Sequence, residues 1–372
     1  NYGSFDVVDK SVSIVGDLNG NVRVASSRVR NLTAEKRVLL SGLRFVRLHA
    51  DDLTRPSLEL AHNDGLVFLE RILTLAPEDQ AALFSAGLRV DDCDGVTVVD
   101  SLLFGSRGFQ GFVGPGPFLY RHEAVAARDA TLALWDTFLL GGRGAKGSFN
   151  LFLPDTFLPP TRGGHGLAQE GGFTFVSGGS ITGGQGGDGD LSLVHLSCLS
   201  GEEGGDGIHL DAHGEVRLLD VQPEGGVGGI KGGDLCVHGP PGEPLGVVSG
   251  QVATIPGEAT RLVADSPLRE GQNAILVLEG PPGAPALLAL SLGVDHLHLA
   301  AAAGTLATPP GALFVPFGPL DPQGFAVATV GVPELGVGVL GVVVTAQGVV
   351  AGPGGGVRLT APTRIVALDA SL

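Results

Sequence analysis

Five acidic residues on two glycine-rich stretches have the type and spacing that best suit a metal ion. Asp188 and Asp190 lie in GGQGGDGD, and Glu202, Glu203 and Asp206 lie in GEEGGDG. Carboxylate oxygens are the hard ligands that Ca²⁺ prefers. The spacing matches neither an EF-hand nor the glycine-rich nonapeptide repeat. The sequence therefore predicts no obligatory cofactor, and calcium at these five residues is the one metal that it suggests.

The three cysteines predict one disulfide bond. Cys198 lies ten residues before Ile208 and Cys236 nine before Leu245, and each of these apolar residues begins a repeat unit. If the units stack as coils about 5 Å apart, equivalent positions are neighbours within reach of a disulfide. We predict the bond Cys198–Cys236, and therefore an oxidising compartment. Cys93, in DDCDG, is expected to be free and buried in a coil turn.

The remaining reactive side chains form no recognisable catalytic set. His296 and His298 alternate on one expected strand without further ligands, so a zinc site is not expected. The stretches GQGGDG and GVGGIKGG do not join a strand to a helix, which a phosphate-binding loop requires. The sequence therefore identifies no catalytic residues, and we favour a protein that is not an enzyme.

Composition favours a folded, turn-rich β protein. The 372 residues include 61 Gly and 24 Pro, yet 43% are apolar, more than a disordered chain contains. The net charge of −16, with only four Lys, excludes nucleic acid and anionic membranes as expected partners. The apolar run 335–357 is rich in Gly and β-branched residues, which suits strand–turn–strand rather than a membrane span.

Internal repetition organises residues 1–260. Apolar strand pairs separated by small polar turns recur at intervals of 26 to 43 residues, which indicates a constant core unit with one expandable loop. Helical periodicity is absent, and a propeller blade would need four strands, so a parallel β-solenoid remains. The residues expected to begin the second strand of each unit and to point inward are Val12, Val38, Leu66, Val96, Leu132, Phe173, Val216 and Val252.

These repeats resemble right-handed parallel β-helix proteins of the pectate-lyase-like superfamily. The opening YGSFDVVDKSVSIVGD is similar to an early coil of that family. More narrowly, the chain resembles secreted bacterial repeat proteins whose β-helix precedes a Gly/Pro/Val-rich β-sandwich. The resemblance implies an all-β fold with a right-handed parallel β-helix followed by a small antiparallel sandwich. It says little about chemistry, because one fold serves many functions.

Enzymes on this fold bring two or three carboxylates together across a groove or hold calcium with stacked carboxylates. Asp91 and Asp92, together with GGHG at 163–166, bear a superficial similarity to the hydrolase pattern, but the elements that accompany it in the family are absent. Because neighbouring residues of a strand point to opposite sides, at most one of the two aspartates could face a groove. We interpret the pair as a coil corner.

The expected domains are the β-helix at 1–260 and the sandwich at 261–372. Long loops are expected at 105–122, 141–166 and 183–207, on one side of the solenoid. Their aromatic residues either form a binding platform or fasten the loops to the flank, and we favour the second interpretation. These aromatic residues are Phe109, Phe112, Phe118, Phe149, Phe152 and Phe157.

Both ends of the chain are expected to take part in assembly. The first coil strand follows Asn1 almost directly, without a capping helix, and an open coil edge is a template for another strand. The terminal strand RIVALDASL is apolar enough to be donated to a second copy. The assembly residues are predicted to be Tyr2, Phe5, Val7, Arg364, Ile365, Val366 and Leu368.

We therefore predict a non-enzymatic, secreted structural protein of the extracellular space or cell surface that self-assembles into a fibre or surface layer. Two alternatives stay open: an adhesin that binds polysaccharide, and a polysaccharide lyase or hydrolase that acts on the loop-rich flank of the β-helix. The expected partners are further copies of the chain and a glycan. The sequence does not specify the glycan or the symmetry of assembly.

Overall fold

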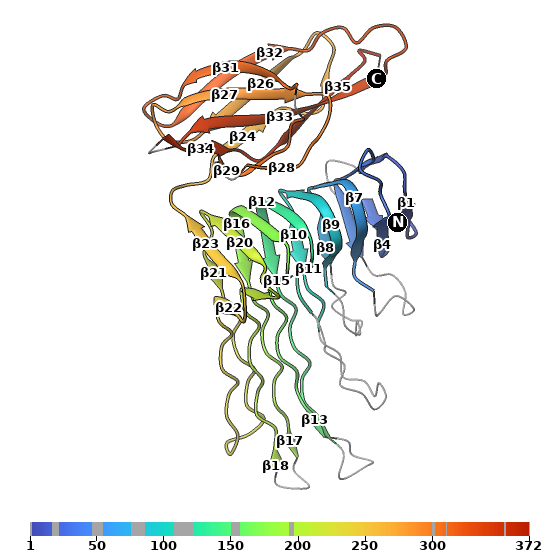
Figure 1. Cartoon of the computed structure of the whole chain (residues 1–372). Coiled ribbons are helices and arrows are strands. Elements are labelled where there is room, and N and C mark those ends of the chain that lie inside the picture. Colours follow the sequence, from blue (N-terminus) through green and yellow to red (C-terminus); the bar gives the residue numbers. More distant parts are fainter. Residues whose placement is uncertain are drawn as a thin grey trace. The chain divides into compact units, whose positions relative to one another are not determined.

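The computed structural model is all-β, as the fold-class prediction requires (Figure 1). It describes residues 2–16, 22–46, 55–75, 86–107, 122–149, 157–192, 197–299, 302–309, 311–352 and 355–371. Two compact units are present. The first comprises Asn1–Thr174, Gly179–Val216 and Val221–Ala253, and the second comprises Phe175–Gly178, Arg217–Asp220 and Thr254–Leu372. None of the described residues forms a helix long and apolar enough to cross a membrane.

The first unit is a parallel β-helix, which confirms the expected fold. Its strands pair in three columns: β1-β4-β7-β9-β11-β15-β19-β22, β2-β5-β7-β9-β12-β16-β20-β23 and β3-β6-β8-β10-β12-β16-β21. The strands are β1 (Asp6–Val8), β2 (Val12–Val15), β3 (Val22–Val24), β4 (Ser27–Arg30), β5 (Arg37–Ser41), β6 (Leu43–Val46), β7 (Leu58–Glu70), β8 (Leu73–Leu75), β9 (Leu88–Val99), β10 (Leu102–Phe104), β11 (Val125–Arg128), β12 (Thr131–Leu140), β15 (Leu167–Glu170), β16 (Phe173–Thr182), β19 (Ile208–Asp211), β20 (Glu215–Leu219), β21 (Pro223–Glu224), β22 (Leu245–Val247) and β23 (Gln251–Ile255).

Inward-facing apolar ladders hold the coils together. Val12 pairs with Val38, and Val96 pairs with Leu132, as the repeat alignment predicts. Val38, Val96, Leu132 and Val216 are buried. Burying each such side chain contributes about 1.5–3 kcal/mol. Val12 is only partly buried because it lies in the first coil.

Three other predicted inward residues differ from expectation. Leu66 pairs with Arg37, and Val67 occupies the buried position instead, so the alignment is wrong by one residue there. Phe173 is also displaced by one residue: its N–H donates to Ala130 O, and the buried residue is Thr174. Val252, in the last coil, is half-exposed.

Acidic and amide residues turn the coil corners. Asp9, Asn31, Asp92 and Asp129 have φ between 45° and 56°, the left-handed region that Asn and Asp tolerate best among residues with a Cβ. Asp91, next to one of these corners, lies 2.6 Å from Arg89 Nε. A corner with an adjacent ion pair accounts for the Asp91–Asp92 pair without catalysis.

The expanded stretches of the later coils form a bundle of extended runs rather than separate loops. We name the runs 141–147, 161–166, 183–190, 199–207, 225–232 and 239–243 the glycine bundle. Figure 1 shows these runs extending from the coil strands toward β13 (Ser148–Phe149), β17 (Leu191–Ser192) and β18 (Ser197–Cys198). The fourth short strand, β14 (Phe157–Leu158), pairs with β13.

Hydrogen bonds between the runs recur at every third residue. Gly141, Gly144 and Gly147 donate to the carbonyls of Thr182, Gln185 and Asp188. The run 183–190 repeats this pattern. Its Gly183, Gly186 and Gly189 donate to the carbonyls of Glu224, Val227 and Ile230. A three-residue period without bonds inside the run is typical of the polyproline II conformation. The runs therefore satisfy their backbone groups by bonding to one another.

Glycine is required because the backbones touch. A ladder of N–H···O bonds of 2.7–2.8 Å links Gly142, Gly164, Gly184, Gly205 and Gly226 in sequence from one run to the next. A Cβ atom on Gly184 or Gly226 would lie 2.0 Å from a carbonyl oxygen of a neighbouring run, and one on Gly205 would lie 1.9 Å from Gly164 O. No side chain fits at that separation.

The second unit contains the antiparallel sandwich. One sheet has the order β24-β26-β32 and the other β25-β35-β33-β27-β31, with β34 and β29 beside β33, and β28 pairs separately with β30. Leu276, Leu278, Leu288 and Val350 are prominent in its apolar core. The strands are β24 (Arg261–Ala264), β25 (Leu268–Arg269), β26 (Asn273–Glu279), β27 (Pro285–Ser291), β28 (Leu297–His298), β29 (Ala302–Ala303), β30 (Thr305–Leu306), β31 (Leu313–Pro319), β32 (Phe325–Gly331), β33 (Gly341–Ala351), β34 (Val357–Leu359) and β35 (Thr363–Leu368).

A single methyl group in the glycine bundle should destabilise the first unit. We expect Gly205→Ala to lower the free energy of unfolding by about 1–3 kcal/mol, the usual cost of overpacking, because the added Cβ would meet Gly164 O. Gly3→Ala is the matched control, since no atom lies within 4 Å of the position of its Cβ. Thermal unfolding of the two variants measures the difference. Equal stability of both would contradict the close packing.

Candidate functional site

The strongest cluster of titratable groups lies where two runs of the glycine bundle enter the β-helix. Run 161–166 leads into β15, and run 199–207 leads into β19. Gly166 N donates to Asp206 O, and Leu167 pairs with Ile208. His165 and Asp206 therefore occupy equivalent places in neighbouring coils, and the strand that follows adds His209.

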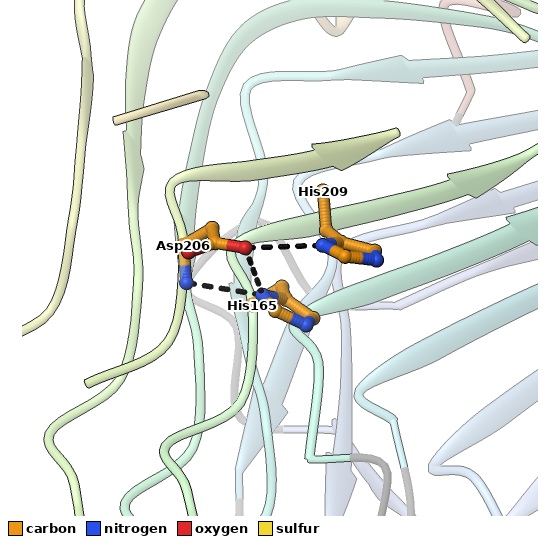
Figure 2. A group of neighbouring side chains, drawn as sticks. All are labelled: His165, Asp206 and His209. Carbon is orange, nitrogen blue, oxygen red and sulfur yellow. Dashed lines mark hydrogen bonds and ion pairs between the residues drawn. The ribbon is translucent and has the colours of Figure 1, made fainter. Parts of the chain in front are cut away.

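Asp206 is the centre of this cluster, which we call the Asp206 centre (Figure 2). Its Oδ2 lies 3.0 Å from His209 Nδ1 and 3.4 Å from His165 Nδ1. Its Oδ1 accepts from Arg162 Nη2 at 2.7 Å and from Glu243 N at 3.1 Å. The two imidazole rings stack with their centroids 4.4 Å apart and 16° between their planes. Both Nδ1 atoms consequently face the same carboxylate.

The hydrogen bonds assign the tautomers of the two rings. Asp206 N donates to His165 Nδ1 at 3.0 Å, so this nitrogen is an acceptor and carries no proton. His209 Nδ1 lies 3.0 Å from an oxygen that can only accept, so it is the donor. Neutral His209 then has its lone pair on Nε2, oriented by a carboxylate as in an Asp–His dyad.

Asp206 is held in its ionised form. Burial raises the pKa of its carboxyl, but the hydrogen bonds from His209 and from Glu243 N, together with the charge of Arg162, lower it further than burial raises it. The pKa therefore lies below the ordinary value of 3.8. Only 3% of the side chain is exposed, compared with 27% for His209. A buried anion is thus covered by a partly accessible imidazole.

The five acidic residues predicted to bind calcium are not gathered around one point. Asp188 receives a hydrogen bond from Arg143, and Asp190 lies 3.5 Å from Lys146. The prediction of calcium at Asp188, Asp190, Glu202, Glu203 and Asp206 stays a prediction. Four of the five residues form ion pairs with basic residues in the structure. Asp188 and Asp190 pair with Arg143 and Lys146, and Glu203 and Asp206 both pair with Arg162.

The predicted disulfide is present. Cys198 and Cys236 are bonded with their Cα atoms 6.0 Å apart, and the bond closes 38 residues of chain. It joins β18 to the stretch that follows the run 225–232, so it ties together the ends of two neighbouring coils. Cys93 is free and buried, as expected. Burial raises the pKa of its thiol to about 11, which makes it a poor nucleophile.

The predicted assembly residues belong to two different units, the first three to the β-helix and the last four to the sandwich. Tyr2 is exposed, Val7 is buried and Phe5 packs edge-on against Phe45 at 6.2 Å. Arg364, Ile365, Val366 and Leu368 belong to β35. That strand pairs with β33 on one side and, at Ala367 and Leu368, with β25 on the other. Donation of β35 to a second copy would require these pairs to separate, and assembly stays a prediction.

Two further predictions concern histidines and aromatic residues. Burial lowers the pKa of His296 to about 4, with the charge of His298 acting in the same direction and Asp295 opposing it. This histidine is therefore a neutral group of the second unit at pH 7. The side chains of the predicted loop aromatics lie outside the described residues: Phe109, Phe112, Phe118, Phe149, Phe152 and Phe157.

An open pocket of about 580 Å³ lies beside the first runs of the glycine bundle, and we call it the arginine pocket. Arg107, Arg143 and Gln185 bring polar groups to it. Its other lining residues are apolar or glycine: Leu75, Phe104, Gly105, Leu140, Gly141, Gly142 and Gly184. The combination of guanidinium and amide donors with an apolar wall was missed by sequence reasoning, because its members come from four successive coils.

Comparison with known proteins finds similarity to solved structures. No family model matches the chain, and no curated protein does. Among solved structures, the enzymatically active domain of tailspike protein 2 of bacteriophage CBA120 matches with a TM-score of 0.26 and 8% identity. The match covers 100% of this chain and 56% of that one, so the chain spans little more than half of that protein's length.

Removal of the charge at the Asp206 centre should give a pH-dependent loss of stability. We expect Asp206→Asn to lower the free energy of unfolding by about 1.5–3 kcal/mol at pH 7, the usual value of hydrogen bonds to a charged group. Because the folded pKa lies below the unfolded one, this contribution is complete above about pH 5 and is lost as the pH falls through the folded pKa.

Denaturant unfolding between pH 7 and pH 2.5 measures this difference. Asp234→Asn is the matched control, because the side chain of Asp234 is fully exposed and its replacement should change stability little. The difference in unfolding free energy between the wild type and Asp206→Asn should become smaller in acid. If it does not, the assignment of an ionised, hydrogen-bonded Asp206 is contradicted.

Proposed function

We propose that this β-helix protein is a non-enzymatic extracellular protein that binds an acidic polysaccharide in the arginine pocket. Of the functions that the sequence left open, this proposal takes the adhesin that binds polysaccharide in preference to the self-assembling structural protein. The observation that carries it is the convergence of two arginines on an apolar-walled pocket in a chain whose net charge is −16. In such a chain, two arginines beside one apolar-walled pocket favour an anionic ligand.

The chemistry of the pocket suits a uronic acid unit. A planar guanidinium donates two parallel hydrogen bonds to a carboxylate, which supports Arg107 and Arg143 as the anchors. The amide of Gln185 can both donate to and accept from sugar hydroxyls. Leu140, 43% exposed, and Phe104 provide apolar surface for the C–H face of the ring. The volume lies in the range usual for small-ligand sites.

The frame of the pocket supports binding without large rearrangement. Two of the glycines that line the pocket, Gly142 and Gly184, belong to the ladder in which the backbones touch. Arg143 is held by its hydrogen bond with Asp188. Such preorganisation reduces the entropy cost of binding.

Three observations support an extracellular location and the absence of catalysis. The disulfide Cys198–Cys236 suits an oxidising compartment. The resemblance of the repeats to secreted bacterial β-helix proteins agrees with it. Among the described residues that line the arginine pocket, none has a carboxylate or an imidazole that could act as a general base.

Binding to a panel of polysaccharides tests the proposal. The full chain should bind a polyuronate and not neutral dextran in affinity electrophoresis or calorimetry. Arg107→Gln and Arg143→Gln should each weaken polyuronate binding about tenfold to a hundredfold, the value of one charge-assisted hydrogen bond. The ligand should be recovered at its original chain length.

Lys146→Gln is the matched control. Lys146 lies in the same run as Arg143 and also pairs with an aspartate, Asp190, but it does not line the pocket. Retention of affinity in this variant separates the pocket from general charge effects. Equal binding of neutral and acidic polysaccharides, or shortened products, would refute the proposal.

A second candidate function, self-assembly, is favoured by the last coil of the β-helix. Leu245 and Val247 continue the inner ladder of Ile208 and Leu210, yet they are 40% and 45% exposed while those two are fully buried. A second copy that stacked on this coil would bury them. Sedimentation should then show larger species at higher concentration, and Leu245→Ser should abolish them. A concentration-independent monomer would exclude this function.

A further inference from the structure

We propose that His165, Asp206 and His209 form a binding site for a transition-metal ion of the zinc class. The three ligand atoms lie within 4.8 Å of one another. Asp206 Oδ2 lies 3.4 Å from His165 Nδ1 and 3.0 Å from His209 Nδ1. Tetrahedral zinc with bonds of about 2.0–2.1 Å places its ligand atoms about 3.3–3.4 Å apart. The two separations from Asp206 Oδ2 are close to that value.

The carboxylate is positioned as a ligand that uses one oxygen. Both donors from outside the histidine pair, Arg162 Nη2 and Glu243 N, bond to Oδ1. Oδ2 is thereby directed at the two rings, and hydrogen bonds of this kind orient metal ligands. Glu203 lies 3.2 Å from the same Arg162 nitrogen and shares its positive charge, which reduces the repulsion of a cation at Oδ2.

The site is accessible from one side. The His209 side chain is 27% exposed and that of His165 13% exposed, whereas Asp206 is buried. Three protein ligands with an open face leave the fourth position to water or to an anionic ligand. Two imidazole nitrogens with one carboxylate oxygen favour Zn²⁺, Co²⁺ or Ni²⁺ and disfavour Ca²⁺. This ion is therefore different from the calcium that the acidic residues suggest.

Binding requires three local changes. The stacked rings, with 16° between their planes, turn so that the plane of each contains the ion. The proton of His209 moves from Nδ1 to Nε2, so this ring releases no proton when Nδ1 binds the ion. The lone pair of His165 Nδ1, which accepts the N–H of Asp206, turns to the ion. The lost hydrogen bond lowers the affinity, and the N–H then needs another acceptor, such as water.

Titration of the full chain with ZnCl₂ after treatment with a chelator tests the proposal. Calorimetry should give one Zn²⁺ per chain, CoCl₂ should give the absorption of a tetrahedral Co²⁺ complex, and CaCl₂ should not compete. His209→Phe and His165→Phe keep a ring for stacking and remove the ligand atoms. Each should weaken Zn²⁺ binding by more than about a hundredfold, since loss of an outer partner alone costs 10–100-fold.

His213→Asn is the control, because His213 lies at an exposed corner with φ 61° that Asn tolerates. It should bind Zn²⁺ like the wild type. Nitrogen NMR of the wild-type histidines provides a measurement that does not depend on folding of the variants: Zn²⁺ should shift Nδ1 of His165 and His209. The tautomer change should also shift Nε2 of His209. Absence of Zn²⁺ binding, unchanged affinity in both Phe variants, or Zn²⁺-dependent shifts confined to other histidines would overturn the site.

Discussion

The contact of glycine backbones between neighbouring runs is the constraint on which the first unit depends. Gly164, Gly184 and Gly205 bond through N–H···O distances of 2.7–2.8 Å, and no Cβ fits between them. This contact replaces an apolar core in a region that has few large side chains. It also fixes the distance between coils at every third residue. Side chains elsewhere in the runs can therefore vary without loss of the frame.

Both candidate sites lie where this frame meets the coil strands. The arginine pocket is lined by glycines of the first runs, and the Asp206 centre lies where two returning runs enter β15 and β19. In each case the side chains come from successive coils, so their spacing along the stack is set by the parallel hydrogen-bond ladder. The frame positions charged groups closely enough to interact, as Asp206 with His209 and Arg143 with Asp188 do.

Opposite charges in neighbouring coils explain how a chain with a net charge of −16 keeps its acidic runs together. Arg143, Lys146 and Arg162 each contact a carboxylate from a later coil. The same pairing explains why acidic residues on glycine-rich stretches need not indicate calcium. Acidic residues that are close in the sequence lie together in space only where the register of the coils brings their side chains together.

The sequence by itself determined the all-β class, the repeat and one covalent link. Apolar alternation predicted the ladders of Val38, Val96 and Leu132, and the spacing from coil starts predicted Cys198–Cys236, because both depend on position within a repeat unit and not on the length of the whole unit. Where the first apolar residue of the strand is not the one that points inward, as at Leu66 and Phe173, the alignment fails by one position. Only the tertiary structure decided what the glycine-rich stretches do. Their hydrogen bonds join residues about 20 or 40 positions apart, and His165 meets His209 across a whole coil. No local pattern records such a pairing, because its spacing equals the length of a coil, and that length varies from one coil to the next.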